Sequence, residues 1–138
     1  MNKRISFVPA LALGMVVLSV PTLATAVTTI DVVDEARLVG GAAVMSVEII
    51  CDLGANSFLA GTTGTIIQRT RFNVTIESGS LGQTAINCNG TPQIFQIAVS
   101  SSRFRPGPAT AQASTIVCNN SPFTCESAQD SKEIQLVE

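Results

Sequence analysis

The sequence lacks histidine, tryptophan and tyrosine, and only 13% of its 138 residues are charged. Without histidine the chain cannot build a Ser-His-Asp or Cys-His arrangement, because imidazole is the base that activates the nucleophile there. A hydrophobic content of 46% excludes a charge-rich disordered protein. We therefore expect a folded protein that is not an enzyme and carries no cofactor.

Charge is also missing from most of the first 26 residues, which have the pattern of a secretory signal peptide. Lys3 and Arg4 form a basic start, an apolar run covers residues 11–18, and Pro21 follows the run. Ala26 ends an Ala-Thr-Ala triplet of the kind that signal peptidases cleave. An uncleaved membrane anchor is the alternative, but the uninterrupted apolar run is shorter than the roughly 20 residues that span a bilayer.

Cleavage after Ala26 would leave a secreted, extracellular domain of residues 27–138 with no membrane span. The pattern of the signal is bacterial. The loss of Lys3 and Arg4 leaves six basic against ten acidic residues, so the secreted domain is acidic. We expect no binding to nucleic acid, since that function requires a broad basic surface.

Side chains branched at Cβ dominate residues 27–138, which contain 10 Val, 11 Ile and 12 Thr but a single Lys. Such side chains suit the pleated surface of a strand. Alternating polarity predicts strands at 28–33, 37–39, 44–51, 65–70, 71–77, 81–88, 93–100, 109–118 and 133–137. Loops are expected at 52–61, 103–108 and 119–124, and turns at 78–80 and 89–90.

These seven to nine short strands predict an all-β domain, most naturally an antiparallel β-sandwich in which each strand buries one apolar face. A small barrel is the alternative that the pattern does not separate from a sandwich. The side chains expected to point inward are Met45, Val47, Ile49, Cys51, Phe72, Val74, Ile76, Phe95, Ile97, Val99, Ala109, Ala111, Ala113, Thr115, Val117, Ile134 and Leu136.

The four cysteines, Cys51, Cys88, Cys118 and Cys125, predict two disulfides, because an even number in an exported chain implies bridges. Three pairings are possible. We favour Cys51–Cys88, which would join the inward faces of two strands, and Cys118–Cys125, which would close a short loop. A zinc site is not expected, because the closest pair has six residues between its members and histidine is missing.

The cysteines, the Cys88-Asn89-Gly90 turn and the segment Phe104–Ala109 resemble small secreted actinobacterial proteins of unknown function. The resemblance covers most of residues 40–138 and implies an immunoglobulin-like β-sandwich. A weaker likeness is to the neocarzinostatin-type apoproteins, which also end in a short disulfide-closed loop and a final strand. Their second loop is short as well, whereas Cys51 and Cys88 are 37 positions apart.

Few residues remain that could carry chemistry. Glu48, Asp52 and Glu77 could supply paired carboxylates to a hydrolase, although charged side chains mostly serve solubility. Two arginine pairs, residues 69 and 71 and residues 103 and 105, could form a small basic patch, and isolated arginines at strand ends are the interpretation that we favour.

The leading hypothesis is a secreted module that binds through its loops, with an unknown protein or a component of the cell envelope as partner. Phe104, Arg105 and Phe123 are the candidate binding residues, because two predicted loops would expose them. The alternative is a carrier of a small apolar ligand, for which the run Ala109, Ala111 and Ala113 would line the cleft.

Overall fold

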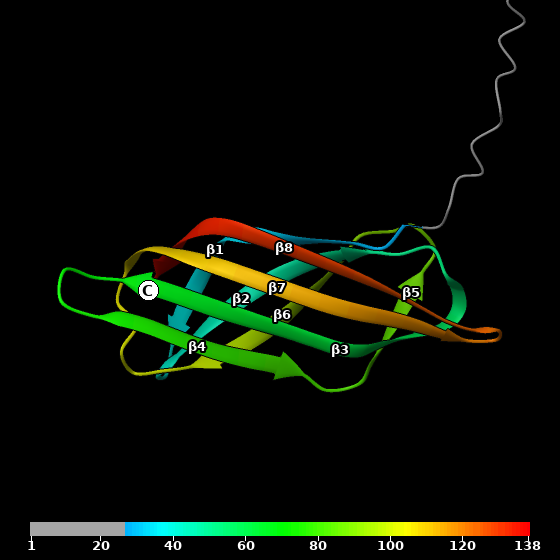
Figure 1. Ribbon diagram of the computed structural model, residues 1–138, viewed down its shortest axis with the longest axis horizontal. Coiled ribbons are helices and arrows are strands. Elements are labelled where there is room, and N and C mark those ends of the chain that lie inside the picture. The colour runs from blue at the N-terminus through cyan, green and yellow to red at the C-terminus, as the bar shows by residue number, and fades with distance from the viewer. Residues whose placement is uncertain (1–26) are drawn as a thin grey trace, which may run out of the picture.

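The computed structural model describes residues 27–138, which form eight strands and, within that range, no helix (Figure 1). The predicted all-β class is confirmed, while the proposed signal peptide of residues 1–26 lies outside the described residues. Among the described residues no helix is long and apolar enough to cross a membrane. The strands are β1 (Thr29–Val39), β2 (Ala42–Ile50), β3 (Gly54–Arg69), β4 (Val74–Leu81), β5 (Thr84–Cys88), β6 (Gln93–Ser100), β7 (Gly107–Asn120) and β8 (Phe123–Val137).

Hydrogen bonds join the strands in the order β4-β3-β7-β8-β1-β2-β6, and β5 pairs with β3. All pairs are antiparallel except β1 and β8, which run parallel where Glu35–Arg37 meets residues 135–137. The expectation of a wholly antiparallel arrangement was therefore wrong at this one pair. β1 also pairs with β2, in antiparallel orientation, and the register of that pairing is irregular between Val32 and Ala36.

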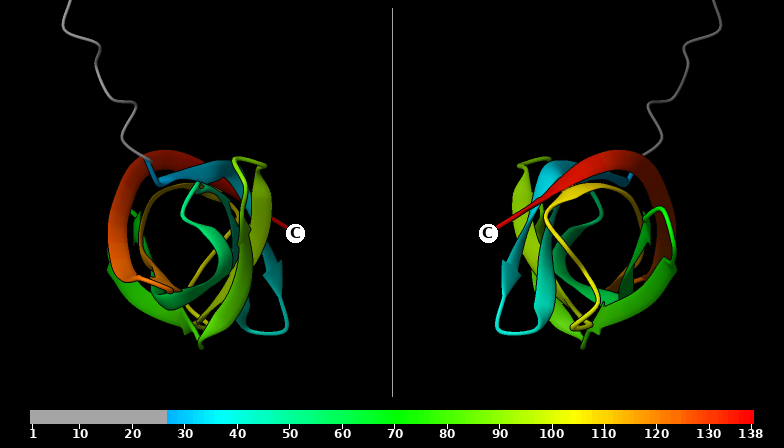
Figure 2. Two further views of the ribbon diagram at one scale, coloured as in Figure 1. Left: turned by 90° about the vertical axis from the view of Figure 1, so that its right-hand side faces the viewer. Right: turned by 90° about the vertical axis from the view of Figure 1, so that its left-hand side faces the viewer.

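The sheet curls until its two edge strands, β4 and β6, face each other, so the views along the long axis of the molecule have a barrel-like outline (Figure 2). β4 and β6 meet at Gly79, where an added Cβ would lie 2.1 Å from the carbonyl oxygen of Ala98. Only glycine allows this approach. The serines on either side made residues 78–80 read as a turn, and that prediction was wrong because Gly79 lies within β4.

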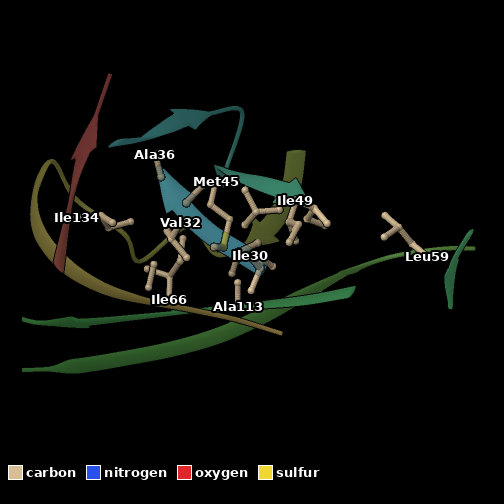
Figure 3. Close-up of a cluster of buried hydrophobic side chains, with 14 of the residues drawn as sticks. Ile30, Val32, Ala36, Met45, Ile49, Leu59, Ile66, Ala113 and Ile134 are labelled. Atoms are coloured by element: carbon tan, nitrogen blue, oxygen red, sulfur yellow. The ribbon is translucent and has the colours of Figure 1, made fainter. Parts of the chain in front are cut away.

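The core fills the space inside the curled sheet (Figure 3). Met45, Val47 and Ile49 of β2 are fully buried, as their alternation predicted. Met45 packs against Gly64 of β3, where a Cβ would lie only 2.5 Å from the methionine sulfur. The predicted inward residues of β7 and β8 are buried as well: Ala109, Ala111, Ala113, Thr115, Val117, Ile134 and Leu136.

Two predicted boundaries were wrong because polar residues disguised strands. The expected loop 52–61 contains the start of β3. The side-chain amide of Asn119, from β7, donates to the carbonyl oxygens of Leu53 and Ala55 in this segment. The final strand begins at Phe123 rather than at residue 133, and its polar first half pairs with β7 throughout. In both segments the polar side chains face solvent or a specific partner, which an apolar alternation does not detect.

Candidate binding surface

The three proposed binding residues differ in exposure and in position. Phe104 is 4% exposed and belongs to the core, so its assignment as an exposed anchor was wrong. Arg105, the next residue, is exposed. Phe123 is exposed as expected, but β7 separates it from Arg105, since Arg105 precedes that strand and Phe123 follows it. The two phenylalanines therefore do not form one surface.

The β6–β7 loop that carries Arg105 is fixed to β3 by Gln68. Gln68 is 4% exposed, and its side-chain amide forms two hydrogen bonds with the Arg105 backbone. Gln68 Nε2 donates to the Arg105 carbonyl oxygen at 2.7 Å, and the Arg105 N–H donates to Gln68 Oε1 at 2.9 Å. Gln68 was not among the predicted site residues. It lies two positions after Ile66, which is fully buried, so the alternation along β3 turns the glutamine inward as well, where its amide needs hydrogen-bond partners.

This attachment brings four arginines to one end of the molecule. Arg69 and Arg71 lie at the end of β3 and in the turn to β4, while Arg103 and Arg105 lie in the β6–β7 loop. Both segments line a hollow of about 520 Å³, to which the turn contributes Thr70 and the loop contributes Arg103 and Arg105. We call the region of these four arginines the arginine end; it lies at the left of Figure 1.

The arginines of this end form no ion pair with any residue of 27–138. The Arg105 guanidinium donates from Nη1 to the backbone oxygens of Ser102 and Phe104, at 2.8 and 3.1 Å, which holds its remaining donors in a fixed direction. Glu138 lies near Arg105 at a neighbouring hollow of about 420 Å³, beyond ion-pair distance. The fold therefore places the two arginine pairs at the same end of the molecule, although the sequence favours isolated arginines at strand ends.

Lys132, unlike the four arginines, forms ion pairs with carboxylates. Its Nζ lies 2.8 Å from Asp31 Oδ1 and 3.4 Å from Asp34 Oδ1. The hydrogen bond to Asp31 is the main cause that raises the pKa of Lys132 above its ordinary value. Lys132 belongs to β8, and the Asp31 and Asp34 carboxylates of β1 neutralise its charge, so it is not available to an anionic partner.

Exposed apolar side chains adjoin the arginines. Phe72, in the turn between β3 and β4, is 84% exposed, and Val74 and Ile76 on the outer face of β4 are 53% and 60% exposed. All three were expected in the core. The strand pattern failed because the chain turns after residue 70 and the outward Arg69 pairs with Val74, which leaves Thr75 pointing inward.

The opposite end holds both disulfides, and we call it the disulfide end. The observed bridges are Cys51–Cys88 and Cys118–Cys125, the pairing that we favoured. The first ties the end of β2 to β5, and the second joins directly opposed residues of β7 and β8. Phe123, at the β7–β8 turn, is 72% exposed here.

The remaining sequence hypotheses find less support. Glu48 lies on β2 and Glu77 on β4, strands that are not neighbours in the sheet, and Asp52 follows β2 in an exposed position. Among the described residues no three Cys, Asp or Glu side chains gather in a way that could hold a metal ion. Ala109, Ala111 and Ala113 pack within the core.

Comparison with models of known protein families and with curated proteins finds no match to this chain.

Proposed function

We propose that this chain is a secreted, non-enzymatic binding module that attaches to an anionic component of the cell envelope through its arginine end. The observation that carries the proposal is the gathering of four arginines, without ion-pair partners among residues 27–138, on a domain with a net negative charge. Unpaired arginines that are close together repel one another, and an anion removes that repulsion while accepting their hydrogen bonds.

Secretion is part of the proposal. It is supported by the signal-like residues 1–26 and by two disulfides, which persist in oxidising compartments. The intact mass of protein recovered from culture medium tests it. The mass should correspond to a chain that begins at Val27 and carries no free thiol.

We further propose that the fold is an immunoglobulin-like sandwich whose layers, β1-β2-β6 and β4-β3-β7-β8, are joined through β1. The change of partner along β1, from β2 alone to β2 and β8, supports two layers rather than a closed ring. Amide hydrogen exchange tests this proposal. Protection of the outer β4 amides by hydrogen bonds to β6 would contradict it.

Binding to isolated envelope fragments tests the function. The protein should sediment with fragments at low ionic strength and dissociate as salt rises, because exposed charges are screened beyond about 10 Å at 0.1 M salt. The variant with Arg69→Gln, Arg71→Gln, Arg103→Gln and Arg105→Gln should stay in the supernatant. A control variant, Lys132→Gln, removes a cation that is paired with Asp31 and Asp34 away from the arginine end, and it should sediment normally. Equal sedimentation of the quadruple variant and the native protein would refute the proposal.

A further inference from the structure

We infer that the anionic component is a lipid bilayer, on which the molecule stands by its arginine end with Phe72 inserted among the headgroups. This inference rests on the proposed function and specifies its partner. It depends on the shape of the β3–β4 turn, on the apolar side chains beside the arginines, and on the distribution of charge along the molecule.

The β3–β4 turn projects beyond the other segments at its end of the molecule (Figure 1). The turn is closed by a hydrogen bond of 2.8 Å from the Thr70 N–H to the Asn73 carbonyl oxygen. The hydroxyl of Thr70 adds a contact of 3.2 Å to the Asn73 N–H. Because these bonds hold the turn, Phe72 is presented outward at 84% exposure instead of folding back on the domain.

Arg71 and Phe72 form a unit that suits a membrane interface. The guanidinium carbon of Arg71 lies 5.6 Å from the centroid of the Phe72 ring, a cation–π arrangement. An aromatic ring beside a cation can enter the headgroup layer while the charge stays with the phosphates. Val74 and Ile76 extend the apolar surface from the turn along β4.

The hollow behind the turn provides a place for a phosphate group. Arg103 and Arg105 line it from the loop, and Thr70 and Asn73 line it from the turn. Arginine recognises phosphate oxygens through paired donors, and the loop carbonyls already orient the Arg105 guanidinium. The bond between Gln68 and the Arg105 backbone keeps both walls in register.

A bilayer explains this surface better than a soluble polyanion does. A polyanion would engage the arginines and leave Phe72, Val74 and Ile76 in water, whereas a membrane interface accepts both kinds of side chain. The domain as a whole is acidic and is repelled by an anionic membrane, whereas at the arginine end four arginines outweigh the neighbouring Glu138, so this end can approach the membrane. The elongated molecule would therefore stand end-on.

Vesicle sedimentation with the secreted protein tests the inference. The vesicles contain phosphatidylcholine alone or with one third phosphatidylglycerol, and polyphosphate serves as the soluble polyanion. The native protein should bind the anionic vesicles and not the neutral ones. Each arginine replaced by glutamine should weaken binding about five-fold at low salt. Phe72→Ser should weaken it by about ten-fold or more, while Phe123→Ser, the matched change at the opposite end, should have no effect.

The lack of tryptophan and tyrosine allows a direct measurement of insertion. In Phe72→Trp the single indole should shift its emission to the blue on anionic vesicles, and in Phe123→Trp it should not. Binding to polyphosphate or envelope fragments that needs the arginines, without vesicle binding or a shift at residue 72, would overturn the bilayer and leave an anionic partner. Loss of arginine dependence in every assay would overturn the proposed function itself.

Discussion

The two ends of the molecule share one structural feature and differ in their disulfides and their charge. At each end a buried side-chain amide fixes a loop: Gln68 holds the β6–β7 loop, and Asn119 holds the segment that enters β3. The disulfide end adds two covalent bridges, whereas the arginine end has no bridge and concentrates four like charges. The covalent cross-links therefore lie at one end, and the surface that we propose for binding lies at the other.

The surfaces of the two ends differ in charge as well. A hollow of about 540 Å³ at the disulfide end is lined by Asp52 and by the amides Asn56, Asn87 and Asn89, with no basic residue. Each end also exposes one phenylalanine, Phe72 or Phe123. Since an exposed phenylalanine is common to both ends, the ring alone does not define a binding site, and the arginines make the difference.

The largest effect on stability is expected from the bridge that joins β2 to β5. Replacing Cys51 and Cys88 by serine should lower the free energy of unfolding by about 4 kcal/mol, because the opened loop is long. The same change at Cys118 and Cys125 should cost about 2.5 kcal/mol, since that loop is short. Urea unfolding measures both values.

Both cysteine variants should bind anionic vesicles like the native protein under conditions where they remain folded. Their bridges lie at the opposite end from the arginines. A loss of vesicle binding in folded protein would show that the two ends are not independent, and would break the comparison.

Replacing either buried amide, Asn119 or Gln68, is expected to have an intermediate effect, and comparing the two variants separates stability from binding. Asn119→Ala should cost about 2–3 kcal/mol, because the amide serves two carbonyl oxygens and the Ser57 hydroxyl, and its oxygen accepts from the Ser121 N–H. Gln68→Ala should cost about 1–2 kcal/mol, because it leaves the Arg105 N–H and carbonyl unpaired at a partly exposed site.

Only Gln68→Ala should also weaken vesicle binding, since the β6–β7 loop would lose its fixed position. Chemical denaturation and sedimentation of the same preparations separate the two effects. If Asn119→Ala weakened binding as much as Gln68→Ala did, the amide at the arginine end would have no special role.

The strands that the sequence predicted well are those with one apolar and one polar face. β6 begins and ends at the predicted residues, and β2 and β7 differ from prediction by only one or two residues at each end. Their alternation is a local property of the chain, so it is visible without the fold. The disulfide pairing could be inferred for a similar reason, because Cys51 continues the inward series of β2.

The candidate site was harder to predict because it depends on contacts between distant segments. Phe72 and Phe104 exchange their expected environments: the turn after residue 70 exposes the first, and the loop held by Gln68 buries the second. Nothing local to Thr70 or Arg103 indicates that the β3–β4 turn and the β6–β7 loop line one hollow. Only the pairing of strands distant in the sequence brings them together.

The smallest effect is expected at Lys132, the cation that already has carboxylate partners. Lys132→Met should leave vesicle binding unchanged and lower the melting temperature only slightly, because exposed ion pairs contribute little.

The neighbouring Asp31 raises the pKa of Lys132 in the folded state. The stabilisation is therefore complete below the pKa of an unfolded lysine and is lost as the pH rises through the higher folded value. The difference in melting temperature between the two proteins should persist at neutral pH and vanish in strong alkali. A difference that grows with rising pH would contradict this assignment, and reduced vesicle binding by this variant would mean that charge anywhere on the domain, rather than the arginine end, drives attachment.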